Sequence, residues 1–380
     1  MEKATNSLMK QMNKSTLLSI VFKEEKISRA QLAKMTKIAK SSVSLLVDEL
    51  LHEGLVIETG EGVSSSKGGR KPIHLMINQD YGYVISLVIR HHVSNIAVCD
   101  LDGNILQLLE SSMDEFRGEP LLIELEKIIK SQITCFKGIK KLLGIGISIP
   151  GIVDMERGVI LHSPELELQE YNIRDRWNEK FGCEIFIDND VNMQSLGENW
   201  KGAGQEYRDF VEISIGTGIG AAIVLNNQLY RGASCIAGEV GYMAISEDAL
   251  NEGIYRYDRF GHFESKASIK RLETMAGKTF VELIQEAEAG NTESLEMILK
   301  TSDLISLGIA NIVSLLNPEA VIINGRYRYA KGLVEQHLIQ RVEQLTPIRT
   351  RLEFSDLGSK ASIYGCVATV LTNLLGIKFL

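Results

Sequence analysis

A short run of small and basic residues near the N-terminus could contact nucleic acid. The run comprises Lys40, Ser41, Ser42 and Ser44. It opens a segment at 39–53 whose apolar residues repeat at i, i+3, i+4, i+7 and i+8 from Val43, which is the spacing of one helix face. Because the first-turn side chains are mostly small, such a helix can approach a major groove closely, and its amides and hydroxyls suit phosphates and base edges. The run therefore predicts a DNA-contacting helix.

The surrounding elements predict the frame that positions this helix. A first helix is expected at 15–22, and the capping box Ser28–Gln31 predicts the start of a second, short helix. Gly54 is placed to end the third helix in a left-handed conformation. Strands at 55–57 and 73–77 then flank a tip rich in Gly and Ser. The order of elements is three helices followed by a hairpin wing.

Charge separates this N-terminal segment from the rest of the chain. Residues 1–78 hold twelve lysines and arginines against eight acidic residues, a net of +4, which leaves −12 on the remainder. A basic segment on an acidic protein is typical of contact with an anion such as nucleic acid. We therefore expect a winged helix-turn-helix domain over 1–78, with a plain three-helix packing module as the alternative. The expected DNA contacts are Ser28, Arg29, Lys37, Lys40, Ser41, Ser42 and Ser44.

The other three hundred residues repeat one order of elements, which predicts a duplicated α/β domain. The first set comprises strands at 83–89, 95–100, 105–109 and 142–149 and an amphipathic helix at 121–131. A second order of strand, glycine turn, strand and hairpin follows at 211–230. We expect two lobes with a cleft between them, formed by residues 79–190 together with the C-terminal helix and by residues 191–360.

These stretches together resemble the ROK family of repressors, open reading frames and kinases. At the N-terminus the sequence is most similar to the xylose-repressor branch, in TKIAKSSVSLLVDELLHEGLVIETG and SSSKGGRKPIHLMIN. Three further stretches resemble the sugar-kinase domain of the family, namely GIGISIPGIVD, FIDNDVNMQSLGE and ISIGTGIGAAIVLNNQLYRGASCIAGEVGYM. The likeness covers nearly the whole chain. It implies an actin/hexokinase-like, sugar-kinase-like domain at 79–380, and a wing–linker junction where Arg70 enters a minor groove.

The resemblance also implies a sugar site. Asn189-Asp190 matches a family pair in which Asn binds a sugar hydroxyl and Asp is the base of the kinases. The chemistry fits, because a carboxylate accepts from two hydroxyls while an amide both donates and accepts. The alternative for Asp190 is the N-cap of a helix at 191–198. Further sugar contacts are expected at Gly151, Glu165, Glu239, Tyr242 and Glu264. Glu165 stands where the family usually has Asn, and we expect the polar groups to converge on the cleft between the lobes.

Departures from the family argue against phosphoryl transfer. Where the kinases carry D-x-G-G-T, this chain has Val88-Ile89-Arg90-His91-His92, so the carboxylate and a glycine of the phosphate loop are gone. The later glycine cluster is thinned to Asn324-Gly325-Arg326. Gly216-Thr217-Gly218 is retained, but such a turn can simply link two strands.

A second departure removes the family's zinc ligands. The positions of one His and three Cys fall on Tyr242, Tyr255, Tyr257 and His262. A structural zinc site needs four good donors, and one plausible ligand remains. The five cysteines are scattered, and no two lie within metal-ligand spacing. We therefore expect no bound metal and no cofactor.

Composition places the chain among soluble globular proteins. Hydrophobic residues make up 44% and charged residues 24%, no apolar run is expected to span a bilayer, and the N-terminus lacks an apolar signal stretch. We expect a cytoplasmic, sugar-responsive DNA-binding repressor without enzymatic activity. Its expected partners are double-stranded operator DNA, a sugar effector and a second copy of the chain, as a homodimer or a dimer of dimers, with no membrane partner.

Two other functions fit parts of the same pattern. One is an ATP-dependent sugar kinase with an added DNA-binding domain, which the altered loop at 88–92 opposes. The other is a DNA-binding regulator whose sugar site is dead and which is controlled by a partner protein, which the altered zinc segment and Glu165 leave open.

Overall fold

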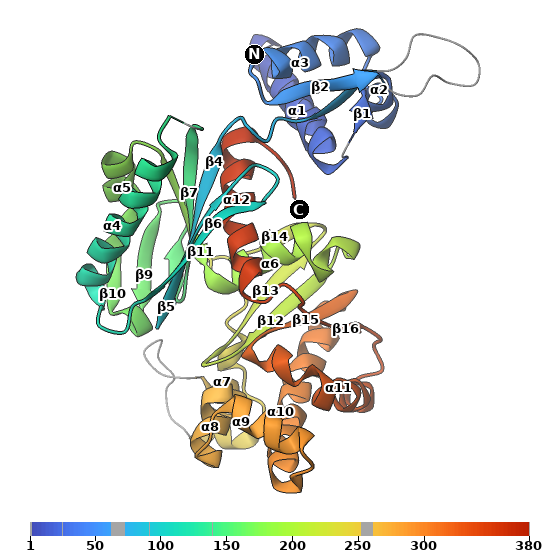
Figure 1. Cartoon of the computed structure of the whole chain (residues 1–380). Coiled ribbons are helices and arrows are strands. Elements are labelled where there is room, and N and C mark those ends of the chain that lie inside the picture. Colours follow the sequence, from blue (N-terminus) through green and yellow to red (C-terminus); the bar gives the residue numbers. More distant parts are fainter. Residues whose placement is uncertain are drawn as a thin grey trace. The chain divides into compact units, whose positions relative to one another are not determined.

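The computed structural model describes residues 2–24, 26–61, 73–90, 92–138, 140–251 and 261–379. The chain divides into two compact units, whose elements are labelled in Figure 1. Unit 1 comprises residues 1–148, 172–187 and 366–379, and unit 2 comprises residues 149–171 and 188–365.

Unit 1 begins with three helices and a small antiparallel sheet. The helices are α1 (Glu2–Lys23), α2 (Arg29–Thr36) and α3 (Lys40–His52), and the strands are β1 (Ile27–Ser28), β2 (Val56–Glu61) and β3 (Ile73–Ile77), in the order β1-β3-β2. The predicted capping box between Ser28 and Gln31 starts α2. Gly54 has the predicted left-handed conformation after α3, with φ of 76°. The apolar stripe of α3 is buried, and its Val43 and Val47 are 0% exposed.

Helix α1 extends far beyond the helix expected at 15–22. Its second half is the buried part, through Leu17, Leu18 and Val21, and this is the part that apolar periodicity detects. The first half contains neither Gly nor Pro, so nothing in its sequence ends the helix. The predicted helix was therefore too short, because the prediction relied on the apolar residues that become buried. The helix also includes a polar segment before them.

The C-terminal tail contacts α1 within unit 1. The Ser15 hydroxyl donates to the carbonyl oxygen of Gly376. The rings of Phe22 and Phe379 meet edge to face with their centroids 5.1 Å apart. The two ends of the chain therefore stabilise each other, a contact that local sequence patterns cannot predict.

Two five-stranded sheets share one strand order, which confirms the predicted duplication. The order is β11-β7-β4-β5-β6 in one sheet and β16-β15-β12-β13-β14 in the other. In each, an antiparallel meander of three strands lies beside a parallel strand. The strands are β4 (Tyr83–Val88), β5 (Val93–Cys99), β6 (Ile105–Ser112), β7 (Leu142–Ile149), β11 (Glu184–Asn189), β12 (Phe210–Ile215), β13 (Ile219–Leu225), β14 (Gln228–Tyr230), β15 (Ala320–Gly325) and β16 (Arg351–Phe354). A third sheet has the order β10-β9-β8 and comprises β8 (Ile152–Asp154), β9 (Val159–Ser163) and β10 (Leu168–Asn172).

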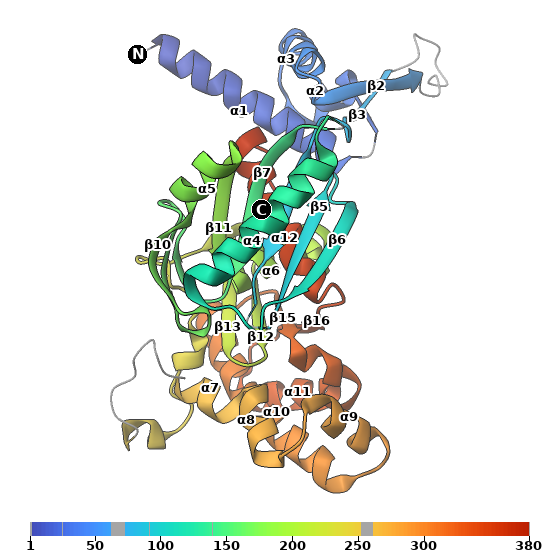
Figure 2. The ribbon, with the colours of Figure 1, turned by 60° about the vertical axis from the view of Figure 1, so that its left-hand side comes forward.

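Helices cover the sheet of unit 1. Helices α4 (Gly118–Phe136) and α5 (Ile173–Phe181) lie side by side on one face of it, as Figure 2 shows. Helix α12 (Ser359–Leu375) ends in this unit and lies close to β7. A side chain at Gly146 would stand only 2.5 Å from the carbonyl oxygen of Cys366, so the close approach of strand and helix requires glycine there.

Unit 2 contains an extensive apolar core. Its helices are α6 (Asp190–Lys201), α7 (His262–Ala267), α8 (Ile269–Ala276), α9 (Phe280–Glu288), α10 (Thr292–Leu316) and α11 (Lys331–Leu345). Buried residues of β12 and β15, such as Ile213 and Ile323, pack with Phe263, Ile305 and Leu338 from these helices.

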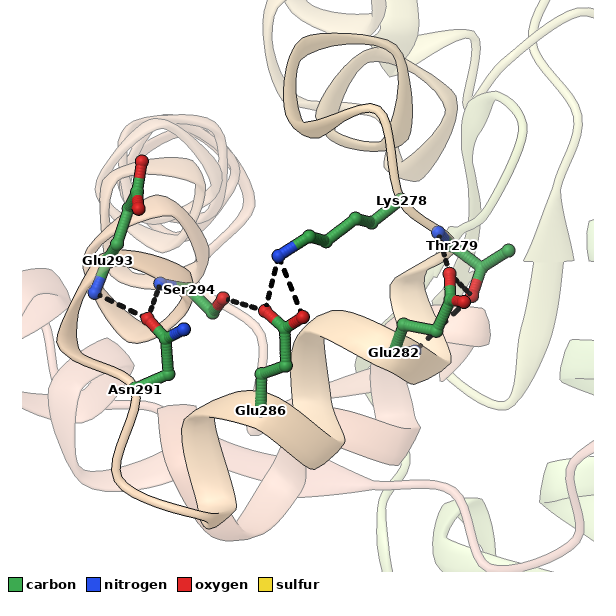
Figure 3. Close-up of polar contacts among 7 residues, drawn as sticks. All are labelled: Lys278, Thr279, Glu282, Glu286, Asn291, Glu293 and Ser294. Carbon is green, nitrogen blue, oxygen red and sulfur yellow. Dashed lines mark hydrogen bonds and ion pairs between the residues drawn. The ribbon is translucent and has the colours of Figure 1, made fainter.

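The junction between α9 and α10 is fixed by side chains (Figure 3). Thr279 and Asn291 cap the two helices by accepting from backbone amides. Glu286 lies between Lys278, whose ammonium is 2.7 Å from Oε1, and the hydroxyl of Ser294. These contacts satisfy amides that a helix N-terminus leaves free, and they fix the entry of the core helix α10.

Helix α10 differs from the expectation that no segment is long and apolar enough to cross a bilayer. Over the described residues it is the helix that meets both criteria. More than half of its most apolar window is buried inside the protein, and it packs in the core of unit 2. Its composition is therefore explained by packing within the protein.

Candidate functional site

The first turn of α3 is exposed to solvent. Lys40, Ser41 and Ser42 are exposed and Ser44 is half-buried, while the opposite face of the helix is buried. The N-cap residue Ala39 provides no side-chain hydrogen bond, so the first amides of the helix lack that partner. Such amides, with hydroxyls and an ammonium beside them, suit a phosphate or a base edge. Lys37, which precedes this turn in a left-handed conformation with φ of 58°, is also exposed.

Two other predicted DNA contacts have structural partners in the protein. Ser28 is 5% exposed and its hydroxyl is used in the capping box, so it stabilises α2 and is not available to DNA. Arg29 lies 2.7 Å from Asp48 and 3.1 Å from Glu58, and so links α2 to α3 and β2. These ion pairs neutralise its charge. Arg70 lies outside the described residues.

Leu45 is an exposed residue of α3 that the sequence analysis did not single out. It is 58% exposed, although it is a large apolar residue on an otherwise well-packed helix. A sequence signal for it exists, since Leu45 falls outside the buried stripe that begins at Val43. An exposed apolar side chain beside serines suits contact with a thymine methyl group.

The seven predicted sugar-site residues all belong to unit 2. Asn189 ends β11 and caps α6, because its Oδ1 accepts from the amide of Val191 at 2.9 Å. Its Nδ2 donates to the carbonyl oxygen of Gly151 at 2.9 Å. The capping role that we considered for Asp190 is therefore performed by Asn189. One amide hydrogen of Asn189 remains beyond these contacts.

Asp190 is the first residue of α6 and is half-buried. The next residue, Val191, packs against Gly220 in the strand that follows the glycine turn, where an added Cβ would stand 3.1 Å from it. Asp190 is thus held beside the segment Gly216–Gly220. This neighbourhood brings α6 and β13 together within unit 2.

The side chain of Glu264 packs against the glycine turn of unit 2. A Cβ at Gly218 would stand 2.4 Å from Oε1 of Glu264, and a Cβ at Gly241 would stand 2.9 Å from Oε2. Burial, followed by the nearby charge of Glu239, raises the pKa of Glu264 to about 7, against which backbone hydrogen bonds from Gly261 and Ile219 act. The Glu264 carboxyl is therefore poised to accept or donate at neutral pH.

Glu239 and Tyr242 lie at the two ends of one short turn. Glu239 is the N-cap of the 3-10 helix Val240–Tyr242, and it is exposed to solvent, although surrounding protein raises its pKa. Tyr242 is half-buried. Glu165, half-buried in the 3-10 helix Pro164–Leu166 after β9, also contributes to the raised pKa of Glu264. The carboxyl groups of Glu239 and Glu165, from two other segments, thus lie near Glu264.

The segment that matches the family's zinc loop is fixed by hydrogen bonds where the structure describes it. His262 is 0% exposed, and its Nδ1 accepts from the amide of Ile245 at 3.2 Å. Its Nε2 lies 3.3 Å from Ser246 Oγ and 3.4 Å from a carboxylate oxygen of Asp248. Within the described ranges, no group of three His, Cys, Asp or Glu residues is arranged to hold a metal ion. Tyr255 and Tyr257 lie outside those ranges.

Asn324 and Arg326, which match the nucleotide-binding positions of the kinases, form contacts with other side chains of the protein. Asn324 is 1% exposed and donates to the buried Glu212 at 2.8 Å. Arg326 contacts both carboxylate oxygens of Glu273. In unit 1, Arg90 is half-buried at the end of the strand where the kinases place a phosphate loop. An Arg in place of Gly restricts how closely backbone can approach a phosphate.

Comparisons with known proteins agree with this arrangement. The model of the ROK family matches residues 85–373. The xylose repressor of Caldicellulosiruptor bescii is 31% identical and is aligned over 97% of this chain and 98% of its own length. A ROK family transcriptional regulator described as a homologue of the E. coli Mlc protein has a TM-score of 0.84 at 22% identity, with 98% of this chain and 99% of that chain covered. A ROK family glucokinase from Streptomyces griseus, solved with glucose and AMPPNP, has a TM-score of 0.62 at 22% identity and covers 75% of this chain and 98% of its own.

Proposed function

Because the chain belongs to the ROK family, we propose that it is a sugar-responsive transcriptional repressor of carbohydrate-metabolism genes. One observation carries the proposal: a single chain combines an exposed, uncapped helix start at Lys40–Ser42 with the carboxyl groups of Glu165, Glu239 and Glu264, which lie near one another in unit 2. A DNA-binding surface and a polyol-binding surface on one chain are what a regulator needs.

The DNA-binding part of the proposal is a winged helix-turn-helix over residues 1–78. Helix α3 enters the major groove, where Ser41, Ser42 and Ser44 contact base edges and Lys37 and Lys40 contact phosphates. Arg70 is proposed to contact the minor groove from the wing. Two copies of the chain, as a homodimer or a dimer of dimers, bind a palindromic operator, because twofold symmetry in the protein is matched by half-sites in the DNA.

The sugar part of the proposal rests on unit 2. Asp190 and Glu239 accept from sugar hydroxyls, and Glu264 accepts or donates according to its protonation. Asn189, Gly151, Glu165 and Tyr242 complete the site. A sugar changes operator affinity only through a difference in its affinity for the DNA-binding and the DNA-free conformations.

The proposed function does not include catalysis, a cofactor or a metal. Val88 and Arg90 stand where the kinases have a carboxylate and a glycine, and the Arg326–Glu273 pair occupies the later turn. As an operator-binding regulator, the protein is proposed to act in the cytoplasm without a membrane partner.

The test joins two measurements on the full chain. A panel of pentoses, hexoses and disaccharides is screened by thermal shift, since a ligand that binds only the native state raises Tm. Operator sequences are selected from a random duplex library, and their affinity is measured with and without the best sugar. The proposal expects one class of sugar to raise Tm and to change operator affinity. A sugar-independent operator Kd across the whole panel would instead support a regulator controlled by a partner protein.

A further inference from the structure

Arg231 is the first residue of the loop that contains Glu239. The loop follows β14 and ends at Val240, the first residue of the 3-10 helix. It closes on itself, because the amide of Ala237 donates to the carbonyl oxygen of Arg231 at 3.0 Å. Its far end is attached to β13, where the amide of Ala221 donates to the carbonyl oxygen of Gly238 at 2.8 Å. Arg231 is therefore at the base of a compact loop that presents Glu239.

The Arg231 side chain leaves this loop and contacts Asp188. Its Nη2 lies 2.6 Å from Asp188 Oδ2, and the two side chains are 24% and 4% exposed. The other oxygen of Asp188 accepts from the amide of Asn189 at 2.8 Å and from Nδ2 of Asn192 at 3.0 Å. One carboxylate thus holds the start of α6 with one oxygen and the Glu239 loop with the other.

The ion pair joins two segments that are far apart in sequence and that supply different site residues. Asp188 directly precedes Asn189 and Asp190, and Arg231 begins the loop to Glu239. A carboxylate as buried as Asp188 needs a compensating charge, and in the part of the chain that the structure describes Arg231 is its cationic partner. The planar guanidinium also fixes direction better than a flexible ammonium does.

We propose that Arg231 is a positioning residue of the sugar site, which sets the spacing between Glu239 and the Asn189–Asp190 pair by way of Asp188. The inference rests on the proposed function, because it concerns the same site. Arg231 itself does not contact the sugar. Its role is to keep an acceptor on the loop in register with the acceptors at the start of α6, so that both reach hydroxyls of one ligand.

The experiment measures sugar affinity by calorimetry, with the sugar that gives the largest thermal shift for the wild-type chain. Arg231→Gln is expected to weaken binding by about 10- to 100-fold, as is common for residues that orient a binding group. Arg231→Lys keeps the charge and is expected to recover part of the loss. Basal operator affinity, measured without sugar, is expected to stay within about twofold of wild type, because the N-terminal module is unchanged.

A double-mutant cycle with Glu239→Gln separates positioning from a general structural role. If Arg231 acts through Glu239, the double variant binds sugar no more than about threefold weaker than Glu239→Gln alone. Losses that multiply would overturn the proposal. Should Arg231→Gln fold poorly, Asp188→Asn/Arg231→Gln removes both charges of the buried pair, and its sugar affinity is expected to fall as much as that of the single variant.

The outcomes also distinguish this inference from the proposed function. If wild type binds a sugar and Arg231→Gln binds it equally well, the positioning role is wrong while the repressor function stands. If the wild-type chain binds no sugar in the panel, both are wrong.

Discussion

The two five-stranded sheets have the same strand order, yet their first turns carry different chemistry. In unit 1 the turn after β4 reads Val88-Ile89-Arg90-His91-His92, without a carboxylate or a glycine. In unit 2 the turn after β12 keeps Gly216 and Gly218, and the space at Gly218 is filled by the carboxyl group of Glu264. The two sheets therefore share their topology but differ in the residues of these turns.

This difference shows which part of a duplicated fold limits its function. The strands of both sheets are set by buried Ile, Leu and Val, which tolerate exchange as long as volume and pattern are kept. The turns carry the polar groups that act on ligands, and a single Gly-to-Arg change there removes the close approach that a phosphate needs. We therefore propose that this chain keeps the fold of a sugar kinase without its nucleotide chemistry.

The largest expected effect is a loss of sugar affinity, found by comparing one variant in the turn of unit 2 with one variant in the turn of unit 1. Gly218→Ala places a methyl group 2.4 Å from Oε1 of Glu264, so the carboxyl group must move, and sugar affinity should fall by about 10- to 100-fold. Arg90→Gly in unit 1 is the matched change and should leave sugar affinity within about twofold. Calorimetry with the responsive sugar measures both. Equal losses in the two variants would remove the functional difference between the turns.

A smaller effect is expected on the DNA-facing side. Lys40 is exposed at the start of α3, and Lys40→Ala should raise the operator Kd about fivefold and reduce the slope of log K against log salt by about one. Lys127→Ala, which removes an exposed lysine from α4, serves as the control for net charge. Fluorescence anisotropy across a salt series reports both values. An unchanged slope in Lys40→Ala would place this residue outside the interface.

The charge of the site predicts a pH-dependent stability. The pKa of Glu264 is raised to about 7, above the value near 4.3 of an exposed glutamate, so ionisation costs the folded state free energy. This cost is absent below the unfolded pKa and fully present above the folded one. Glu264→Gln should therefore raise Tm by about 2–4 °C at pH 8, the size of about 1 kcal/mol, and change it little at pH 4.5.

Calorimetric scans at the two pH values test this expectation. Gln340→Ala, which changes an exposed residue of α11 that does not titrate, is the control and should shift Tm equally at both pH values. A destabilised Glu264→Gln variant at pH 8 would mean that the ionised carboxylate is favoured in the folded protein.

No formation of sugar phosphate is expected when the wild-type chain is tested in a kinase assay. Because the turn in unit 1 has lost its carboxylate, sugar phosphate formed from ATP and a panel of pentoses and hexoses should match the blank without protein. Mass spectrometry of the product detects small amounts. Sugar phosphate that forms with wild type and disappears with Asp190→Asn would show that unit 2 still performs phosphoryl transfer.

Sequence patterns predicted the elements better than the contacts between them. The apolar stripe from Val43, the capping box at Ser28 and the repeated strand order could all be found, because each is a local pattern of burial or hydrogen bonding. Residues 7–12 of α1 escaped prediction, since they are helical and exposed. Ser28 was assigned to DNA because its type suits a phosphate, whereas its burial is visible only in the fold.

Sequence patterns provided the residue types of the candidate site, which remain a prediction, and not the contacts among them. Asn189 was expected to bind sugar, and the structure shows that its side-chain oxygen caps α6. The pair formed by Asp188 and Arg231 was missed, because neither residue has a sequence signal that points to the other. Long-range ion pairs of this kind depend on how β11 and the loop after β14 meet, which no local pattern encodes.

We propose that a sugar bound in unit 2 changes the affinity of the N-terminal module for operator DNA. The most direct test is an anisotropy titration of labelled operator with the wild-type chain and with Asp190→Ala, each with and without saturating sugar. We expect sugar to shift the wild-type Kd by about tenfold or more, whereas Asp190→Ala should have the same basal Kd and no shift. An Asp190→Ala variant that responds to sugar like wild type would contradict the account, because the effector would then bind elsewhere.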